Sequence, residues 1–181
     1  MKSIEIKGKQ QKYRIQKAND PNNTDIISER ETMLKLPDKL FEYKFQQELI
    51  NKLYLNIDHS NDFIYKKELM REIKQKLNSY NLQDNNNNKF QHSPNANISF
   101  ESTVEKIVAS KLKCYYCNCN MKLFYKIVRD MEQWTLDRID NNLPHKLDNI
   151  VISCLKCNLQ RRCKDKEKFL FTKKLSIIKN D

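Results

Sequence analysis

Four of the six cysteines form two Cys-x-x-Cys pairs, and this spacing is suited to binding a metal ion. One pair is Cys114 and Cys117 and the other is Cys154 and Cys157, with 36 residues between the pairs. Structural zinc prefers a closed tetrahedral set of four soft ligands, and each pair can place two sulfurs on one side of a tight turn. We therefore predict one structural zinc ion held by these four thiolates.

The other two cysteines are weaker candidates. Cys119 competes with Cys117 as a ligand, but Cys114 and Cys117 have the better spacing. Cys163 falls in a segment predicted to be helical and is interpreted as a small apolar residue. The alternative to a zinc site is four reduced, buried thiols.

Between and after the cysteine pairs lie side chains of the types that hydrolyse phosphodiester bonds. Asp137 lies near the end of a strand-like segment, and Asn158 directly follows the second cysteine pair. One carboxylate and one amide oxygen could hold magnesium or manganese, because such ions keep several waters. His145 is the only histidine of this segment, and its ordinary pKa suits a general base. The alternatives are a strand-end ion pair for Asp137 and an exposed loop position for His145.

These side chains need a scaffold, and the C-terminal half predicts one of class α+β. Residues 102–112 have the apolar spacing of a helix after a capping-box pattern. Strands are predicted over 121–128, 134–139 and 150–153, and a basic helix from Asn158 to about Lys174. We assign residues 99–181 to this zinc-bearing domain.

The N-terminal half predicts helices and linkers. Residues 1–36 are interpreted as a basic flexible arm, 37–82 as a helical pair and 83–98 as an Asn-rich linker. The pair is predicted from apolar residues that recur every fourth position, namely Phe41, Phe45, Leu49 and Leu53, then Tyr65, Leu69, Ile73 and Leu77.

The charge balance favours nucleic acid as the partner. The chain has 34 Lys and Arg against 23 Asp and Glu, a net charge of +11, and such a field attracts polyanions. We expect charge reversal at Arg161 and Arg162, in the basic helix, to weaken this binding without unfolding the protein. Without an apolar run of about 18 residues or a secretory signal, we expect no membrane span and an intracellular, reducing compartment.

The order of these motifs resembles the zinc-stabilised HNH endonucleases of phages and large DNA viruses. The resemblance covers roughly residues 100–165. The residues that carry it are Cys114-x-x-Cys117, Leu136-Asp137-Arg138-Ile139-Asp140, His145, Asn149 and Cys154-x-x-Cys157-Asn158. It implies a ββα-metal fold, in which two strands, the loop between them and one helix enclose a catalytic ion.

The resemblance also implies roles for single residues. Asp137 matches the aspartate that ligates the ion, and Asn158 matches the final His or Asn that faces the ion from the helix. Asn149 matches the middle asparagine, which braces the loop through backbone hydrogen bonds. Many family members have Asp-His where this chain has Asp137-Arg138, so the usual general base is missing from its usual place. Either His145 has taken that role, with Arg138 as a phosphate clamp, or the site is inactive.

Three functions remain open from the sequence. The first is a metal-dependent HNH endonuclease that hydrolyses nucleic acid, with DNA favoured over RNA as the substrate. The second is a catalytically inactive HNH-like zinc protein that binds nucleic acid as a structural part of a ribonucleoprotein or virion. The third is a zinc-dependent protein-interaction module. Residues 1–98, which lie outside the resemblance, could bind protein partners in any of these.

Overall fold

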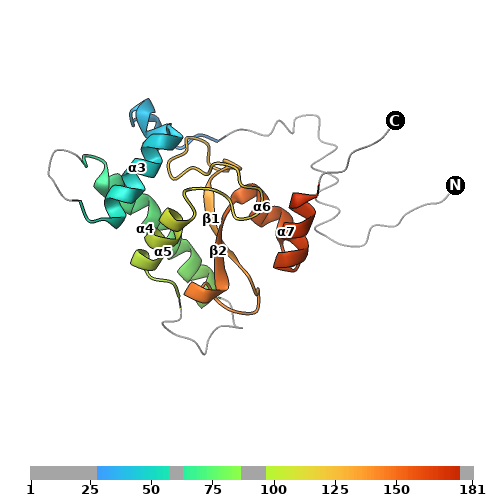
Figure 1. Ribbon diagram of the computed structural model, residues 1–181. Helices are drawn as coiled ribbons and strands as arrows, with labels where there is room; N and C mark the ends of the chain where they lie inside the picture. Colours follow the sequence, from blue (N-terminus) through green and yellow to red (C-terminus); the bar gives the residue numbers. More distant parts are fainter. Residues whose placement is uncertain (1–27, 58–62, 87–96, 176–181) are drawn as a thin grey trace, which may run out of the picture.

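The chain folds as helices around one short antiparallel hairpin, a mixed helix-and-sheet architecture. A computed structural model of the protein describes residues 28–57, 63–86 and 97–175. In Figure 1 the two strands lie between α3, α4 and α5 on one side and α6 and α7 on the other. The linker residues 87–96 and arm residues 1–27 lie outside the described residues.

The hairpin and the helix after it follow the order predicted from the cysteine-rich half. Strand β1 (Trp134–Arg138) pairs with β2 (Ile150–Cys154), with Trp134 opposite Cys154 and Asp137 opposite Val151. A short 3-10 helix, η3 (Leu147–Asn149), ends the intervening loop. Helix α6 (Leu155–Arg161) starts directly after β2, so Asn158 lies within its first two turns rather than opening it.

Helices α3 (Tyr43–Tyr54), α4 (Lys66–Asn85) and α5 (Phe100–Ala109) each contribute buried apolar residues to the same core as the hairpin. On α4, Leu69, Ile73 and Leu77 are all buried, which confirms the four-residue spacing of the predicted apolar face. Helix α4 runs to Asn85 and so extends into the segment predicted to be a linker. No helix among the described residues is long and apolar enough to cross a membrane.

The prediction of a flexible arm is wrong for residues 28–36. This segment contains the short helix α2 (Glu31–Leu34), whose Met33 is buried in the common core with Leu40 of the 3-10 helix η1 (Asp38–Phe41). Arg30 forms an ion pair of 2.7 Å with Glu72 of α4. Burial of Met33 and this ion pair fix the segment against the domain, so the N-terminal and C-terminal halves share one core.

The strand predicted over residues 121–128 does not form. Gln46 of α3, which is fully buried, takes the place of a neighbouring strand for this segment. Its Oε1 accepts hydrogen bonds from the backbone N–H groups of Leu123 (2.6 Å) and Phe124 (3.1 Å), and its Nε2 donates to the Phe124 carbonyl. The apolar run that resembled a strand therefore enters the core as an irregular segment, in which a side chain satisfies the backbone polar groups of residues 123 and 124.

The single basic helix predicted over 158–174 is two helices. Helix α6 ends at Arg161, and Arg162 has a positive φ of 51° that reverses the chain. The Arg161 guanidinium donates to the Lys164 carbonyl at 2.7 Å and holds this turn closed. Asp165 then caps α7 (Lys166–Lys174) by accepting from the Lys168 amide. Similarly, α5 begins earlier than predicted, with Ser99 rather than Ser102 as its N-cap.

Replacement of Gln46 should be costly, because it leaves the buried amides of Leu123 and Phe124 without an acceptor. We expect Gln46→Ala to lower the free energy of unfolding by about 2 kcal/mol or more. Its neighbour Gln47 makes exposed hydrogen bonds to Tyr43 and the Lys111 carbonyl, so Gln47→Ala should cost about 1 kcal/mol or less. Urea unfolding of both variants measures the difference; equal losses would contradict the role assigned to Gln46.

Candidate metal centre and the adjoining polar cavity

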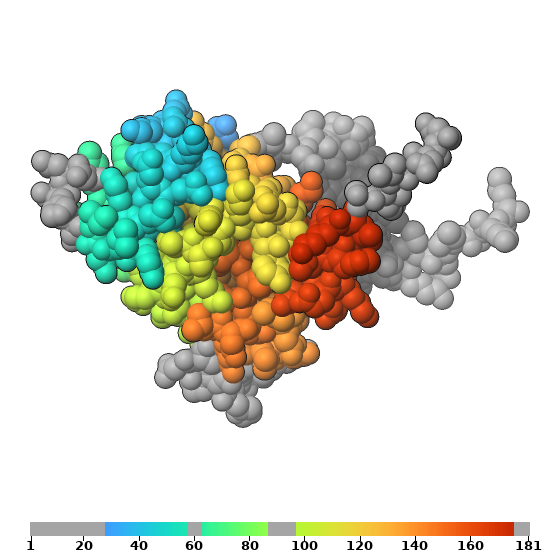
Figure 2. All heavy atoms as spheres, viewed as in Figure 1, coloured from blue at the N-terminus to red at the C-terminus, as the bar shows by residue number. Residues whose placement is uncertain are grey.

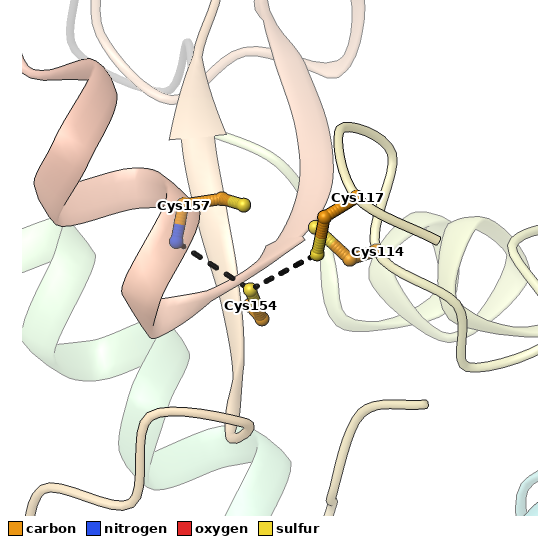
Figure 3. Close-up of side chains that lie close together, drawn as sticks. All are labelled: Cys114, Cys117, Cys154 and Cys157. Atoms are coloured by element: carbon orange, nitrogen blue, oxygen red, sulfur yellow. Dashed lines mark hydrogen bonds between the residues drawn. The ribbon is translucent and has the colours of Figure 1, made fainter. Parts of the chain in front are cut away.

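The four cysteines predicted to bind zinc come together at one end of the hairpin. Their sulfurs all lie within 4.8 Å of one another, and Figure 3 shows the two pairs facing each other. The Cys117 and Cys154 sulfurs are 3.8 Å apart, which is the separation expected for sulfurs bound tetrahedrally at about 2.3 Å from zinc. This cysteine cluster, formed by Cys114, Cys117, Cys154 and Cys157, could hold a metal ion such as zinc.

Local backbone geometry gives each pair its knuckle shape. Asn118 adopts a left-handed φ of 56°, which asparagine tolerates better than most residues, and its amide donates to the Cys114 carbonyl at 2.9 Å. At the second pair, the Cys154 sulfur accepts a hydrogen bond of 3.4 Å from the Cys157 amide and caps α6. Amide donors of this kind stabilise thiolates, the form in which cysteine binds metal.

The close approach of the thiols shifts the pKa values of Cys114 and Cys154. Hydrogen bonds from Cys154 and Cys157 lower the pKa of the Cys114 thiol far below its ordinary value. The same sharing raises the pKa of Cys154 to about 11. Cys119 does not belong to the cluster of described ligands, and burial raises the pKa of its thiol. The presence of Cys117 in the cluster, with Cys119 outside it, agrees with the spacing argument that preferred Cys117 as the ligand.

The cluster is covered by aromatic contacts between elements that are distant in sequence. Tyr116, in the first pair, packs edge-to-face on Phe169 of α7 with ring centroids 5.0 Å apart. Figure 2 shows the yellow segment that contains the first pair lying against the red α7. The Tyr115 amide donates to the Ile152 carbonyl at 3.0 Å, so the first pair is attached to β2 by backbone as well as by sulfur.

A polar cavity of about 330 Å³ lies beside the hairpin and brings together four of the predicted site residues. It is bounded by the end of β1, the loop that follows, α6 and the C-terminal turns of α4. Its lining includes Asp137, Arg138, His145 and Asn158, together with Tyr80 and Arg162. Side chains that could ligate an ion, accept a proton and contact a phosphate therefore share one concave site.

Asp137 forms an ion pair, the alternative considered for it from the sequence, but the pair is buried and its partner was not predicted. Its partner is Arg161 of α6, whose Nε and Nη2 donate to the two carboxylate oxygens at 2.6 and 2.9 Å. The Tyr116 hydroxyl adds a third hydrogen bond of 2.6 Å. Asp137 is 4% exposed and Arg161 1%. A carboxylate accepts about four hydrogen bonds, so three of its positions are taken and about one remains.

His145 is buried rather than exposed, and it is fixed by Asp84 of α4. The His145 Nδ1 lies 2.9 and 3.0 Å from the two Asp84 oxygens, and the His145 backbone amide donates to the same carboxylate at 2.8 Å. The Tyr80 ring packs on the imidazole with centroids 4.6 Å apart. Burial lowers the pKa of His145 below its ordinary value of 6.5 and outweighs the opposing effect of Asp84. Burial therefore favours the neutral imidazole.

Asn158 and Arg138 complete the lining. The Asn158 Nδ2 donates to Thr135 Oγ1 at 3.1 Å and to the Leu136 carbonyl at 3.3 Å. Its amide oxygen accepts no hydrogen bond from the described residues and is available to a ligand. Arg138 Nη1 lies 3.7 Å from Asp84 Oδ1 and donates to the Leu143 carbonyl at 3.4 Å. Arg138 thus lies between the loop and α4 at the cavity wall.

Asn149 lies behind the cavity and joins the two ends of the loop. Its Oδ1 accepts from the Asp140 amide at 2.9 Å, and its Nδ2 donates to the carbonyls of Asp140 and Pro144 at 3.0 Å each. These are backbone hydrogen bonds of the kind that the resemblance implies for this position. They fix the loop on which His145 is carried.

Sequence reasoning missed Asp84, Tyr80, Tyr116 and Arg161. Tyr80 and Asp84 are four residues apart and so share one face of α4. The sequence around them is polar, so it did not indicate that this end of α4 is buried. Arg161 was assigned to a nucleic-acid surface. The structure corrects this, because Arg161 is buried under Asp137 while Arg162 is exposed.

Comparison with known proteins leaves the motif evidence to stand by itself. No family model matches the chain, and no curated protein or solved structure matches it. The HNH resemblance therefore remains a proposal that depends on the residues and geometry described above.

The cysteine cluster predicts one zinc ion per chain. Cys154→Ser should lose the ion and severely destabilise residues 99–175, because structural zinc can contribute on the order of 10 kcal/mol of folding energy. Cys119→Ser should keep one zinc ion, since Cys119 lies outside the cluster. Metal analysis and thermal unfolding of both variants provide the test. Zinc-free wild-type protein that stays folded under chelation would contradict it.

Arg161 and its neighbour Arg162 should now differ sharply. Arg161→Glu should unfold the protein, because it buries a second carboxylate beside Asp137; losing one partner of a buried ion pair alone costs about 3–5 kcal/mol. Arg162→Glu should leave the free energy of unfolding nearly unchanged and weaken nucleic-acid binding, most strongly at low salt. Denaturant unfolding and binding titrations at several salt concentrations distinguish the two. A stable Arg161→Glu protein would contradict the ion pair described here.

Proposed function

We propose that this protein is a metal-dependent endonuclease of the HNH type that hydrolyses phosphodiester bonds in nucleic acid, with DNA as the preferred substrate. The observation that carries the proposal is the polar cavity, which gathers Asp137, Arg138, His145 and Asn158 beside a ββα unit. These four residues were selected from sequence motifs alone, and the motifs did not require that they share one cavity.

His145 is suited to act as the general base. An ionised carboxylate only accepts hydrogen bonds, so the Asp84 contact places the imidazole proton on Nδ1 and leaves the Nε2 lone pair free. A neutral imidazole in the cavity can take a proton from a water molecule that attacks phosphorus. Burial supports this by keeping the pKa of His145 below 6.5.

Arginine side chains near the cavity support phosphate binding. The planar guanidinium of Arg138 can contact two phosphate oxygens at once, and Arg162 lies on the same wall. Further exposed cations follow along α6 and α7, namely Lys156, Lys164, Lys168 and Lys174. A nucleic-acid backbone bound at the cavity would meet the positive charge of Arg138 and Arg162.

Magnesium or manganese would be held by Asp137 and Asn158. Each offers one oxygen position not used by the described residues, and two protein oxygens suffice for an ion that keeps its waters. The adjacent Arg161 charge makes this a weak site, which the phosphate oxygens of the substrate would have to complete. When bound, the ion would supply charge stabilisation at the scissile phosphate and its leaving oxygen.

The Asp137–Arg161 ion pair favours a second candidate. A carboxylate already neutralised by arginine attracts a cation less than a free one, so the cavity could bind nucleic acid without cutting it. In that case the protein would be a structural nucleic-acid-binding component of a ribonucleoprotein or virion, with the cysteine cluster holding its fold. The basic surface on α6 and α7 serves both candidates equally.

The two candidates are separated by a cleavage assay on supercoiled plasmid, single-stranded DNA and RNA with magnesium or manganese. For a nuclease we expect nicking that requires the added ion and that falls about 100-fold or more in His145→Ala, the usual effect of losing a general base. The rate should stay level to a lower pH than a histidine of ordinary pKa would allow and decline as pH falls through the lowered pKa of His145, since the base must be neutral.

His92→Ala is the matched control, because His92 falls in residues 83–98, which the sequence predicts to be a linker. It should cut at the wild-type rate. Full activity in His145→Ala would remove His145 as the base. Salt-dependent binding without cleavage in any divalent ion would replace the nuclease with the structural candidate.

A further inference from the structure

Helix α4 lies outside the part of the chain that resembles HNH nucleases, yet two of its side chains contact residues that line the polar cavity. Tyr80 and Asp84 lie one turn apart on the same face of α4. Tyr80 accepts a hydrogen bond of 3.1 Å from the Leu136 amide of β1 and packs on the His145 ring. The Asp84 carboxylate accepts a hydrogen bond from the His145 backbone amide and also contacts the ring Nδ1 of His145.

This arrangement goes beyond the requirements of a simple structural contact. Both carboxylate oxygens lie within 3.0 Å of Nδ1, and the two side chains are only 3–4% exposed. A buried carboxylate that accepts from Nδ1 selects one tautomer and one ring orientation. The Tyr80 ring restricts rotation of the imidazole from one face. Arg138 lies 3.7 Å away and balances the carboxylate charge.

We infer that Asp84 is a positioning residue that holds the His145 imidazole in the Nδ1–H tautomer, so that Nε2 is presented to the cavity as the base. Asp84 does not touch substrate and acts through His145. The inference deepens the proposed function and depends on it for its kinetic part. The tautomer itself can be measured whether or not the protein cleaves nucleic acid.

The sharpest variant is Asp84→Asn, which keeps the shape of the side chain. The His145 backbone amide can only donate, so it should retain the amide oxygen of the new asparagine. The asparagine NH₂ group would then take the place of Oδ1, 3.0 Å from Nδ1, and a donor at this position favours an Nδ1 that accepts over an Nδ1–H shared with the retained oxygen. The proton would move to Nε2, which blocks the nitrogen that must take a proton from water.

The first readout is the tautomer, from nitrogen chemical shifts of 15N-labelled histidine in the full chain. His145→Ala assigns the His145 signal by its disappearance. We expect an Nδ1–H imidazole in the wild type and an Nε2–H imidazole in Asp84→Asn. The same tautomer in both proteins would overturn the inference, even if the wild type is an active nuclease.

The second readout is kinetic. Asp84→Asn should lower kcat by about 100-fold or more, with KM little changed. In a His145→Ala background, Asp84→Asn should have no further effect on kcat, because a residue that acts through His145 has nothing left to position. Independent losses that multiply would overturn the positioning role.

Asp130→Asn is the matched control, since Asp130 forms an ion pair of 2.9 Å with Lys122 away from the cavity. It should retain the wild-type tautomer and kcat. If the wild type does not cleave any substrate, the proposed function fails while the tautomer measurement still decides the role of Asp84.

Discussion

A two-stranded hairpin is too small to be stable alone in water, and the candidate site of this protein is built on one. The structure supports the hairpin from outside at both ends and on both faces. At one end the cysteine cluster connects the start of the domain to β2 and α6. At the other end Asn149 closes the loop, and Asp84 of α4 holds its buried histidine. These contacts from the cysteine cluster, the loop and α4 hold the ten strand residues in place, and the candidate site depends on them.

The most informative contact for function is the Asp137–Arg161 ion pair, because it serves stability and limits chemistry. It connects β1 to the end of α6, and with Tyr116 it connects both to the cysteine cluster. The same hydrogen bonds neutralise the carboxylate that the HNH resemblance assigns to the ion. Replacing Asp137 would leave Arg161 buried and unpaired, so loss of activity in such a variant would not separate catalysis from folding. His145 and Asp84 are better probes for this reason.

The sequence predicted most accurately those features that depend on local spacing. The two Cys-x-x-Cys pairs, the hairpin strands and the buried face of α4 all follow from periodicity over a few residues. Features decided by contacts between distant residues were missed. The segment 121–128 has the composition of a strand, but Gln46 supplies the hydrogen bonds of residues 123 and 124 from 77 positions or more away along the chain. Arg161 looks like any surface cation of a basic helix until its partner is known. His145 was predicted as a base, but its burial and its partner Asp84 were not predicted.

Side chains from α3 and α4 reach the backbone of the cysteine-rich half at several points. Gln46 binds residues 123 and 124, Lys76 donates to the Trp134 carbonyl, and Tyr80 binds the Leu136 amide. The segment whose motifs resemble those of HNH nucleases is therefore not a portable module in this protein. A fragment cut at residue 99, where the motifs suggest a boundary, would expose those backbone groups and the apolar face beneath them. Any transfer of this unit to another protein, by recombination or by design, would have to carry the two helices with it.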